Sequence, residues 1–251
     1  AKSLGQDYSK MTVNGLLDEI RSIKGSSKKE FEALEKMAPA LSEAVLAIPN
    51  TKALETTEIL LDVMERMELK SLDSLMAMGK MTRVLEIASR RISEVDTLKT
   101  INIRILKLIA KINAQNPTDY FLRYQLAELV SETTKRLPVA QTSELVGPLA
   151  DAIPASDKGG EKAVKIVRTL AYTLAEITSG ISASELSSLN TKLFDVIRRV
   201  KGSDDDAQTM RRDLAHVLGA SAKRIPPQEA LAMSLSALEL FGYLVSSLQR
   251  Y

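Results

Sequence analysis

Apolar side chains recur along the chain in a pattern that repeats every 44 or 45 residues. The repeat is clearest at a short joint, written LAIPN at 46–50, KRLPVAQ at 135–141 and AKRIPPQ at 222–228. Self-similarity at a fixed period indicates a repeat architecture. One apolar residue from each joint forms an aligned column: Ile48, Ile92, Leu137, Ile181 and Ile225.

Two more apolar columns precede the joint, by seven and by eleven residues. Together with the joint residue they form one stripe of a helix, which predicts a helix that ends at each joint. The column at seven residues contains Leu41, Leu85, Val130, Leu174 and Leu218. The column at eleven residues contains Met37, Met81, Leu126, Leu170 and Leu214.

A second helix is predicted after each joint, because four segments share one ending. These are LLDEIRSI at 16–23, LLDVMERM at 60–67, ILKLIAKI at 105–112 and LFDVIRRV at 193–200. In the remaining repeat VGPLADAI at 146–153 takes this place and is shorter by about one turn.

The pattern predicts eleven helices, and no stretch shows the alternation typical of strands. At the joints, a basic residue and an apolar residue precede a proline. Proline ends one helix and suits the first turn of the next. The predicted spans are 12–24, 27–48, 51–68, 71–92, 94–113, 117–137, 140–153, 158–180, 183–201, 204–224 and 227–249.

These helices predict an all-α fold, a right-handed α-solenoid of about five 44-residue helical-hairpin repeats plus an N-terminal half-repeat. A lone helix pair cannot bury both faces, so the pairs must stack. We expect one domain over 1–251. Its parts are the half-repeat 12–24 and repeats at about 27–68, 71–113, 117–153, 158–201 and 204–249.

The length of the unit and its two-helix form resemble HEAT and armadillo repeats. The resemblance covers nearly the whole chain at the level of architecture. The proline usual in the first helix of a HEAT repeat is present once, as Pro39. The resemblance implies an extended surface that binds other proteins.

Composition narrows the function classes. The net charge is +2, with 34 basic and 32 acidic residues, which does not by itself favour nucleic acid or a membrane surface. Cysteine is absent, which excludes disulfides and cysteine-bound zinc and suits a cytoplasmic location. The apolar segment 231–248 contains Glu239 and four serines, so we expect a buried helix and no membrane span.

Signals for catalysis are weak, and we expect no enzyme and no cofactor. His216 is the only histidine, and no nucleophile motif accompanies it. The acidic run SDDDAQ at 203–208 suits a helix start better than a calcium loop, which needs more oxygen ligands at spaced positions.

Basic pairs precede three of the joints in one register and should form a ridge along one edge of the stack. They have two interpretations: compensation of the helix dipole, or a docking strip for an acidic or phosphorylated partner. The first and fourth repeats interrupt the ridge with Leu46-Ala47 and Ser179-Gly180. The ridge consists of Arg90, Arg91, Lys135, Arg136, Lys223 and Arg224.

The leading hypothesis is a non-enzymatic scaffold that binds another protein or a peptide, with an acidic partner favoured by the ridge. Second-helix residues expected to face the partner are Lys99, Asn102, Arg198 and Arg199.

An alternative is a structural component of a larger assembly or of a longer repeat protein. The closing helix has two apolar stripes, and a terminal repeat has only one neighbour, so we expect one stripe to support a homo-oligomer. A nucleic-acid-binding repeat protein is a third, weaker alternative. The residues assigned to self-association are Met233, Leu240 and Leu244.

Overall fold

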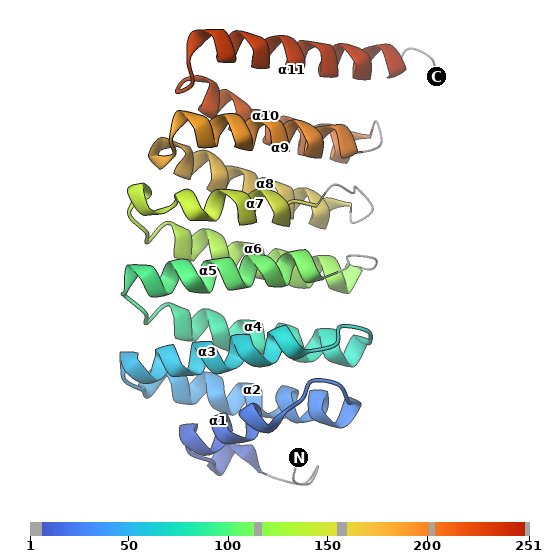
Figure 1. Ribbon diagram of the computed structural model, residues 1–251. Coiled ribbons are helices and arrows are strands. Elements are labelled where there is room, and N and C mark those ends of the chain that lie inside the picture. Colours follow the sequence, from blue (N-terminus) through green and yellow to red (C-terminus); the bar gives the residue numbers. More distant parts are fainter. Residues whose placement is uncertain (1–6, 113–116, 155–159, 201–203, 249–251) are drawn as a thin grey trace. The chain divides into compact units, whose positions relative to one another are not determined.

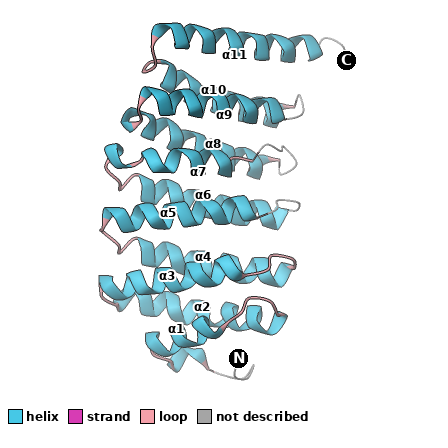
Figure 2. Ribbon diagram, in the orientation of Figure 1, coloured by secondary structure: helices cyan, strands magenta, loops and turns pink. Residues whose placement is uncertain are grey.

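The computed structural model describes residues 7–112, 117–154, 160–200 and 204–248. Within these ranges the chain forms eleven α-helices and four short 3-10 turns, and it contains no strand (Figure 2). The predicted all-α class is therefore confirmed. The predicted handedness, and the prediction of one domain over 1–251, stay predictions.

Contacts between Cα atoms divide the chain into two compact units. Unit 1 comprises residues 1–113 and 121–136, and unit 2 comprises residues 114–120 and 137–251. The dividing positions lie shortly before, inside and shortly after one helix, α6 (Pro117–Thr134).

Unit 1 is built from two layers of helices (Figure 1). One layer contains α1, α3 and α5, and the other contains α2 and α4, with α3 packed against α4. Side chains of α6 accept hydrogen bonds from Arg90, directly after α4, and from Asn102 of α5, and residues 121–134 of α6 belong to this unit. The elements are the 3-10 turn η1 (Tyr8–Lys10), α1 (Val13–Ser22), α2 (Lys28–Ala47), α3 (Asn50–Arg66), α4 (Leu72–Ser89), α5 (Val95–Lys111) and α6 (Pro117–Thr134).

Unit 2 repeats the arrangement. Helix α8 packs against α10 in one layer, while α9 packs between α7 and α11 in the other (Figure 1). The elements are η2 (Val139–Gln141), η3 (Ser143–Leu145), α7 (Val146–Ala152), α8 (Glu161–Ile177), η4 (Thr178–Gly180), α9 (Ala183–Arg199), α10 (Asp205–Ala222) and α11 (Pro227–Leu248).

Ten of the eleven helices follow their predicted spans to within a few residues. The exception is the helix predicted over 140–153, because α7 begins only at Val146 and two 3-10 turns precede it. Pro148 accounts for the difference. Proline lacks an N–H group, so it is tolerated in the first turn of a helix but not in its interior. Pro148 is the third residue of α7, which fixes the start of this helix.

The predicted core columns are confirmed. Every member of the two columns that precede the joints is buried in both units. The joint residues Ile92, Leu137, Ile181 and Ile225 are buried as well, whereas Ile48 is half-buried. Removal of these side chains from water is the main stabilising term of each unit.

Helix α2 begins with a reciprocal capping box. The Ser27 hydroxyl accepts the N–H of Glu30, and the Glu30 carboxylate accepts the N–H of Ser27 at 3.0 Å and that of Lys24 at 2.8 Å. Burial raises the pKa of Glu30, but the backbone N–H groups of Lys24, Ser26 and Ser27 and the Ser27 hydroxyl outweigh it and lower the pKa to about 2. The carboxylate therefore stabilises the folded state in its ionised form.

We expect Glu30→Gln to lower the free energy of unfolding at neutral pH by about 1 kcal/mol. Because the folded-state pKa lies below the ordinary value of 4.5, this stabilisation is complete above about pH 4.5 and is lost as the pH falls toward 2. Urea titrations between pH 2 and 7 should show wild type and variant converging at the acid end. The control Glu32→Gln, in the same helix, should differ from wild type by less than about 0.5 kcal/mol throughout. A gap between Glu30→Gln and wild type that persists at pH 2 would contradict the assignment.

None of the described helices is both long enough and apolar enough to cross a membrane.

Candidate interaction surfaces

The basic ridge divides into two kinds of side chain. The second member of each pair is an arginine that donates to backbone carbonyls at the end of the preceding first helix. Arg91 donates to the carbonyls of Leu46 and Ile48 at 3.0 and 2.7 Å. Arg136 donates to those of Ser89, at 2.9 Å, and Ile92. Arg224 donates to those of Thr178 and Ile181.

These arginines fasten neighbouring repeats to each other. The last carbonyls of a helix have no partner within that helix, and a guanidinium satisfies two of them at once. Arg91, Arg136 and Arg224 thus have a structural role, while Arg136 and Arg224 are also exposed, and their assignment to a docking strip stays a prediction. Figure 1 shows the helix ends that they join, α2 to α4 and α8 to α10.

The two interruptions of the ridge now have physical reasons. In the described part of the chain, Ala47 has no preceding first helix whose carbonyls would need a donor. At Gly180 the backbone of Val139 approaches so closely that a Cβ atom would lie 2.6 Å from the Val139 carbonyl carbon and 2.8 Å from its Cγ1. Backbone contact replaces the arginine at this joint.

The first member of each pair remains on the surface. Arg90 is exposed but pairs with Glu86 at 2.8 Å and with Glu132 at 3.2 Å. Lys135 and Lys223 are exposed. The charge of Arg90 is therefore neutralised by two carboxylates.

The residues predicted on the second helices have different environments. Asn102 is fully buried, and its side chain bonds to the hydroxyls of Thr133 and Thr134. Its prediction as a partner-facing residue is therefore wrong. Lys99 is half-buried and pairs with Asp96 at 3.5 Å. Arg198 and Arg199 are exposed, and both bond to Asp195, through its carboxylate and its carbonyl respectively.

The buried asparagine recurs in unit 2. Asn190 is also buried, and its amide oxygen accepts the hydroxyl of Ser221 at 2.6 Å. Asn102 and Asn190 are equivalent positions of the second helices, and Thr133 and Ser221 are equivalent positions of the first helices. A buried polar group is costly without a partner, so these bonds fix how a second helix packs against the next first helix.

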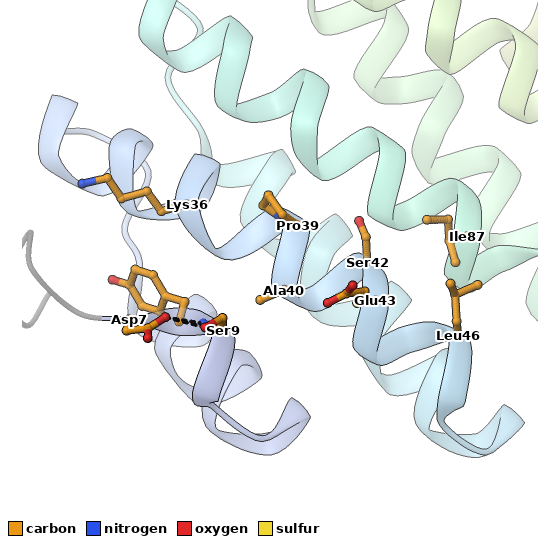
Figure 3. Close-up of a pocket in the computed structure, with 10 residues that line it drawn as sticks. Asp7, Ser9, Lys36, Pro39, Ala40, Ser42, Glu43, Leu46 and Ile87 are labelled. Atoms are coloured by element: carbon orange, nitrogen blue, oxygen red, sulfur yellow. Dashed lines mark hydrogen bonds between the residues drawn. The ribbon is translucent and has the colours of Figure 1, made fainter.

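A hollow in unit 1 lies between η1, α2 and the end of α4 (Figure 3). It has a volume of about 530 Å³. Figure 3 shows Pro39, Ala40, Ser42, Glu43 and Leu46 along α2, with Ile87 of α4 at one end and Asp7 and Ser9 opposite α2. We call this hollow the α2 groove.

The sequence prediction missed the α2 groove because nothing was predicted for residues 7–10. Asp7 caps η1 by accepting the backbone N–H of Ser9 at 3.2 Å, and Tyr8 is buried. Hydrogen bonds from Ser9, the strongest through its hydroxyl, and from Lys10 lower the pKa of Asp7. Burial raises the pKa of the Tyr8 phenol. The signal that could have found η1 is the aspartate two residues before Ser9, a common turn former.

The groove combines apolar and polar surface. Pro39 and Leu46 are apolar and exposed. The charged residues of the groove are one cation, Lys36, and two anions, Glu43 and Asp7. Such a surface suits an apolar anchor with a basic neighbour.

A smaller hollow of about 220 Å³ lies between α3 and α5 of unit 1. Arg104 of α5 lines this hollow and pairs with Glu65 at 2.7 Å and with Asp62 at 2.6 Å. Hydrogen bonding to Glu65, with a smaller contribution from Asp62, raises the pKa of Arg104 against its desolvation. The charges of Arg104, Glu65 and Asp62 are paired with one another. These ion pairs favour packing of α3 against α5 over binding of a ligand in this hollow.

The closing helix α11 carries three exposed leucines on one side. Leu231, Leu235 and Leu238 are 63%, 53% and 69% exposed, whereas Met233 is half-buried. The exposed leucines belong to the other apolar stripe of α11, and the assignment of Met233 to self-association stays a prediction. The side chains of Leu240 and Leu244, which complete that assignment, lie outside the described residues.

No group of three or more histidine, aspartate or glutamate side chains among the described residues is placed to hold a metal ion. In the acidic run before α10, Asp204 accepts the N–H of Ala207 at 2.8 Å and so caps the helix. Ser203, the predicted cap, lies outside the described residues. Comparison with protein-family models and with curated proteins finds no match to this chain.

Proposed function

We propose that the chain is a non-enzymatic helical-repeat protein of the HEAT or armadillo type that binds a segment of another protein in the α2 groove. The observation that carries the proposal is the combination of exposed Pro39 and Leu46 with a hollow of about 530 Å³. A concave surface with a few convergent polar groups is the usual form of a binding site. Glu43 and Asp7 favour a partner with an apolar side chain beside a basic one.

A peptide-display selection against the purified chain tests this proposal. The selected peptides should share an apolar residue next to lysine or arginine. Leu46→Lys should weaken their binding at least about tenfold, because it removes the apolar wall and repels the basic residue. Leu72→Lys is a matched control, since Leu72 is equally exposed on unit 1 but does not line the groove.

Isothermal titration of wild type and both variants gives the answer. Equal weakening by Leu46→Lys and Leu72→Lys would contradict docking in the groove. A selection that enriches no peptide would contradict the proposed function itself.

A second candidate is a structural component that self-associates through α11. At the position of Leu238, the earlier second helices carry Leu61 and Phe194, which are buried. Helix α3 packs against α5, and α9 packs against α10 and α11, whereas Leu238 remains exposed. An apolar position that is covered in earlier repeats favours a further helix as its cover.

Sedimentation equilibrium separates this candidate from the first. Leu235→Lys together with Leu238→Lys should convert an oligomer into a monomer and leave the helical circular dichroism unchanged. A wild-type chain that stays monomeric at millimolar concentration would exclude association through this stripe.

A further inference from the structure

Helices α8 and α10 of unit 2 present four side chains as a two-by-two array. Arg168 and Tyr172 lie one turn apart on α8, and Arg212 and His216 lie one turn apart on α10. The two arginines are 44 residues apart, as are Tyr172 and His216, so each pair occupies one register of the repeat. Because α8 and α10 pack together, the pairs lie beside each other.

One buried carboxylate holds the two arginines. The side chain of Asp213 is 4% exposed, and its carboxylate lies 3.0 Å from Nε of Arg168 and 4.0 Å from Nε of Arg212. The side chain of Arg212 is 72% exposed. Two guanidinium groups around a single carboxylate leave one positive charge in excess, and the fork of an arginine suits a further carboxylate.

The aromatic half of the array is an exposed stacked pair. The ring centroids of Tyr172 and His216 lie 5.1 Å apart, with 32° between the ring planes. Both rings are exposed. Gly219, one turn after His216, is exposed as well, and no atom would come within 4 Å of a Cβ atom there. The rings therefore form a flat and accessible apolar surface next to the arginines.

The array is specific to unit 2 among the described first helices. In unit 1 the equivalent positions carry Gly79 and Arg83 on α4, and Tyr124 and Glu128 on α6. The Tyr124 hydroxyl donates to the Glu128 carboxylate, which raises the pKa of that tyrosine to about 12. Helix α6 thus carries a carboxylate where α8 and α10 carry a ring, and helix α4 carries an arginine there.

We propose that this array is a docking surface for an acidic peptide segment of a partner protein. One glutamate or aspartate meets Arg168 and Arg212, and an aromatic side chain packs on Tyr172 and His216. The two rows are one helical turn apart, about 6 Å along the axis. In an extended peptide, side chains two positions apart point the same way and are separated by nearly the same distance, about 6.7 Å.

The charges that surround the array favour an extended peptide over a polyanion. Lys165 is already paired with Glu161 at 2.8 Å, and Glu176 lies one turn beyond Tyr172. Asp205 and Asp206 lie at the start of α10. A long run of phosphates would meet these carboxylates, whereas a single acidic side chain would not. The array is separate from the α2 groove, so either surface can fail its test without the other.

The single histidine of the chain provides the test, because its imidazole gives one set of carbon-bound proton signals in a heteronuclear NMR spectrum. The probe is a seven-residue peptide in which glutamate and phenylalanine alternate at every second position, with serine between them. We expect the His216 signals to shift and saturate on titration of the full-length chain. Arg212→Gln and Tyr172→Ser should each weaken binding at least about fivefold.

Arg212→Gln is preferred to a change at Arg168, because Arg168 is the closer partner of the buried Asp213. Arg198→Gln, which changes another exposed arginine, on α9, should leave the affinity unchanged and serves as the control. Circular dichroism establishes that each variant keeps its helices.

Four results would overturn the proposal. The first is a saturating shift of equal strength with a peptide that has glutamine in place of glutamate. The second is tighter binding of single-stranded oligothymidylate than of the peptide, which would mark a nucleic-acid surface. The third is unchanged peptide affinity in both Arg212→Gln and Tyr172→Ser. A signal that does not respond to millimolar peptide would also refute the proposal.

Discussion

Gly180→Ala is expected to destabilise unit 2 by at least about 3 kcal/mol, the upper end of the usual cost of forcing extra atoms into a packed site. The new Cβ atom would overlap the carbonyl oxygen of Val139 and lie 2.6 Å from its carbonyl carbon. A flexible side chain could move aside, but here the obstacle is backbone at the joint between two repeats. Thermal and urea unfolding followed by circular dichroism measure the effect.

Gly219→Ala provides the control for this substitution. Gly219 lies within α10, on the exposed surface of the same unit, and a Cβ atom there meets nothing within 4 Å. The same chemical change should therefore stabilise the protein by about 0.5–1 kcal/mol, because alanine loses less backbone entropy in a helix than glycine does. Opposite signs at the two glycines are the expected result. If both changes proved neutral, the close approach at Val139 would be refuted.

Arg136→Gln is expected to lower the free energy of unfolding by about 2 kcal/mol, since hydrogen bonds to a charged group contribute about 1.5–3 kcal/mol. The shorter glutamine cannot reach the carbonyls of Ser89 and Ile92, which lose their donor. The adjacent Lys135→Gln removes the same charge from the exposed side of the ridge and should change stability by less than about 0.5 kcal/mol.

Urea unfolding of the two variants distinguishes the interpretations of the ridge. If compensation of the helix dipole were the whole role of these residues, both changes would cost the same small amount. Equal effects of Arg136→Gln and Lys135→Gln would therefore contradict the fastening role.

The repeat pattern was sufficient to predict the helices and their buried stripes. Leu126, Leu170 and Leu214 are buried because one helical period aligns them with the joint residue, and this relation is local in the sequence. The late start of α7 could not be read from periodicity alone, since the signal is a single residue, Pro148, whose effect depends on its place in the first turn.

The candidate surfaces were less predictable, because their determinants are contacts between repeats. Asn102 is polar and was placed on the surface, yet its partner Thr133 lies 31 residues away in the chain. Arg136 is exposed as its charge suggests, but the carbonyls to which it donates are more than 40 residues distant in the chain. The interruption of the ridge at Ala47 and Gly180 was the available signal, since a pure dipole effect would not depend on what precedes the repeat.

The joints also determine which repeat can follow which. An arginine before the joint residue suits a predecessor that ends in unpaired carbonyls, as at Ile48, Ile92 and Ile181. Gly180 instead leaves room for the close approach of the Val139 backbone, two residues after Leu137. A repeat that carries arginine at this position would place a long side chain where Val139 approaches. The repeats are therefore not interchangeable, because one residue of each joint must fit the repeat that precedes it.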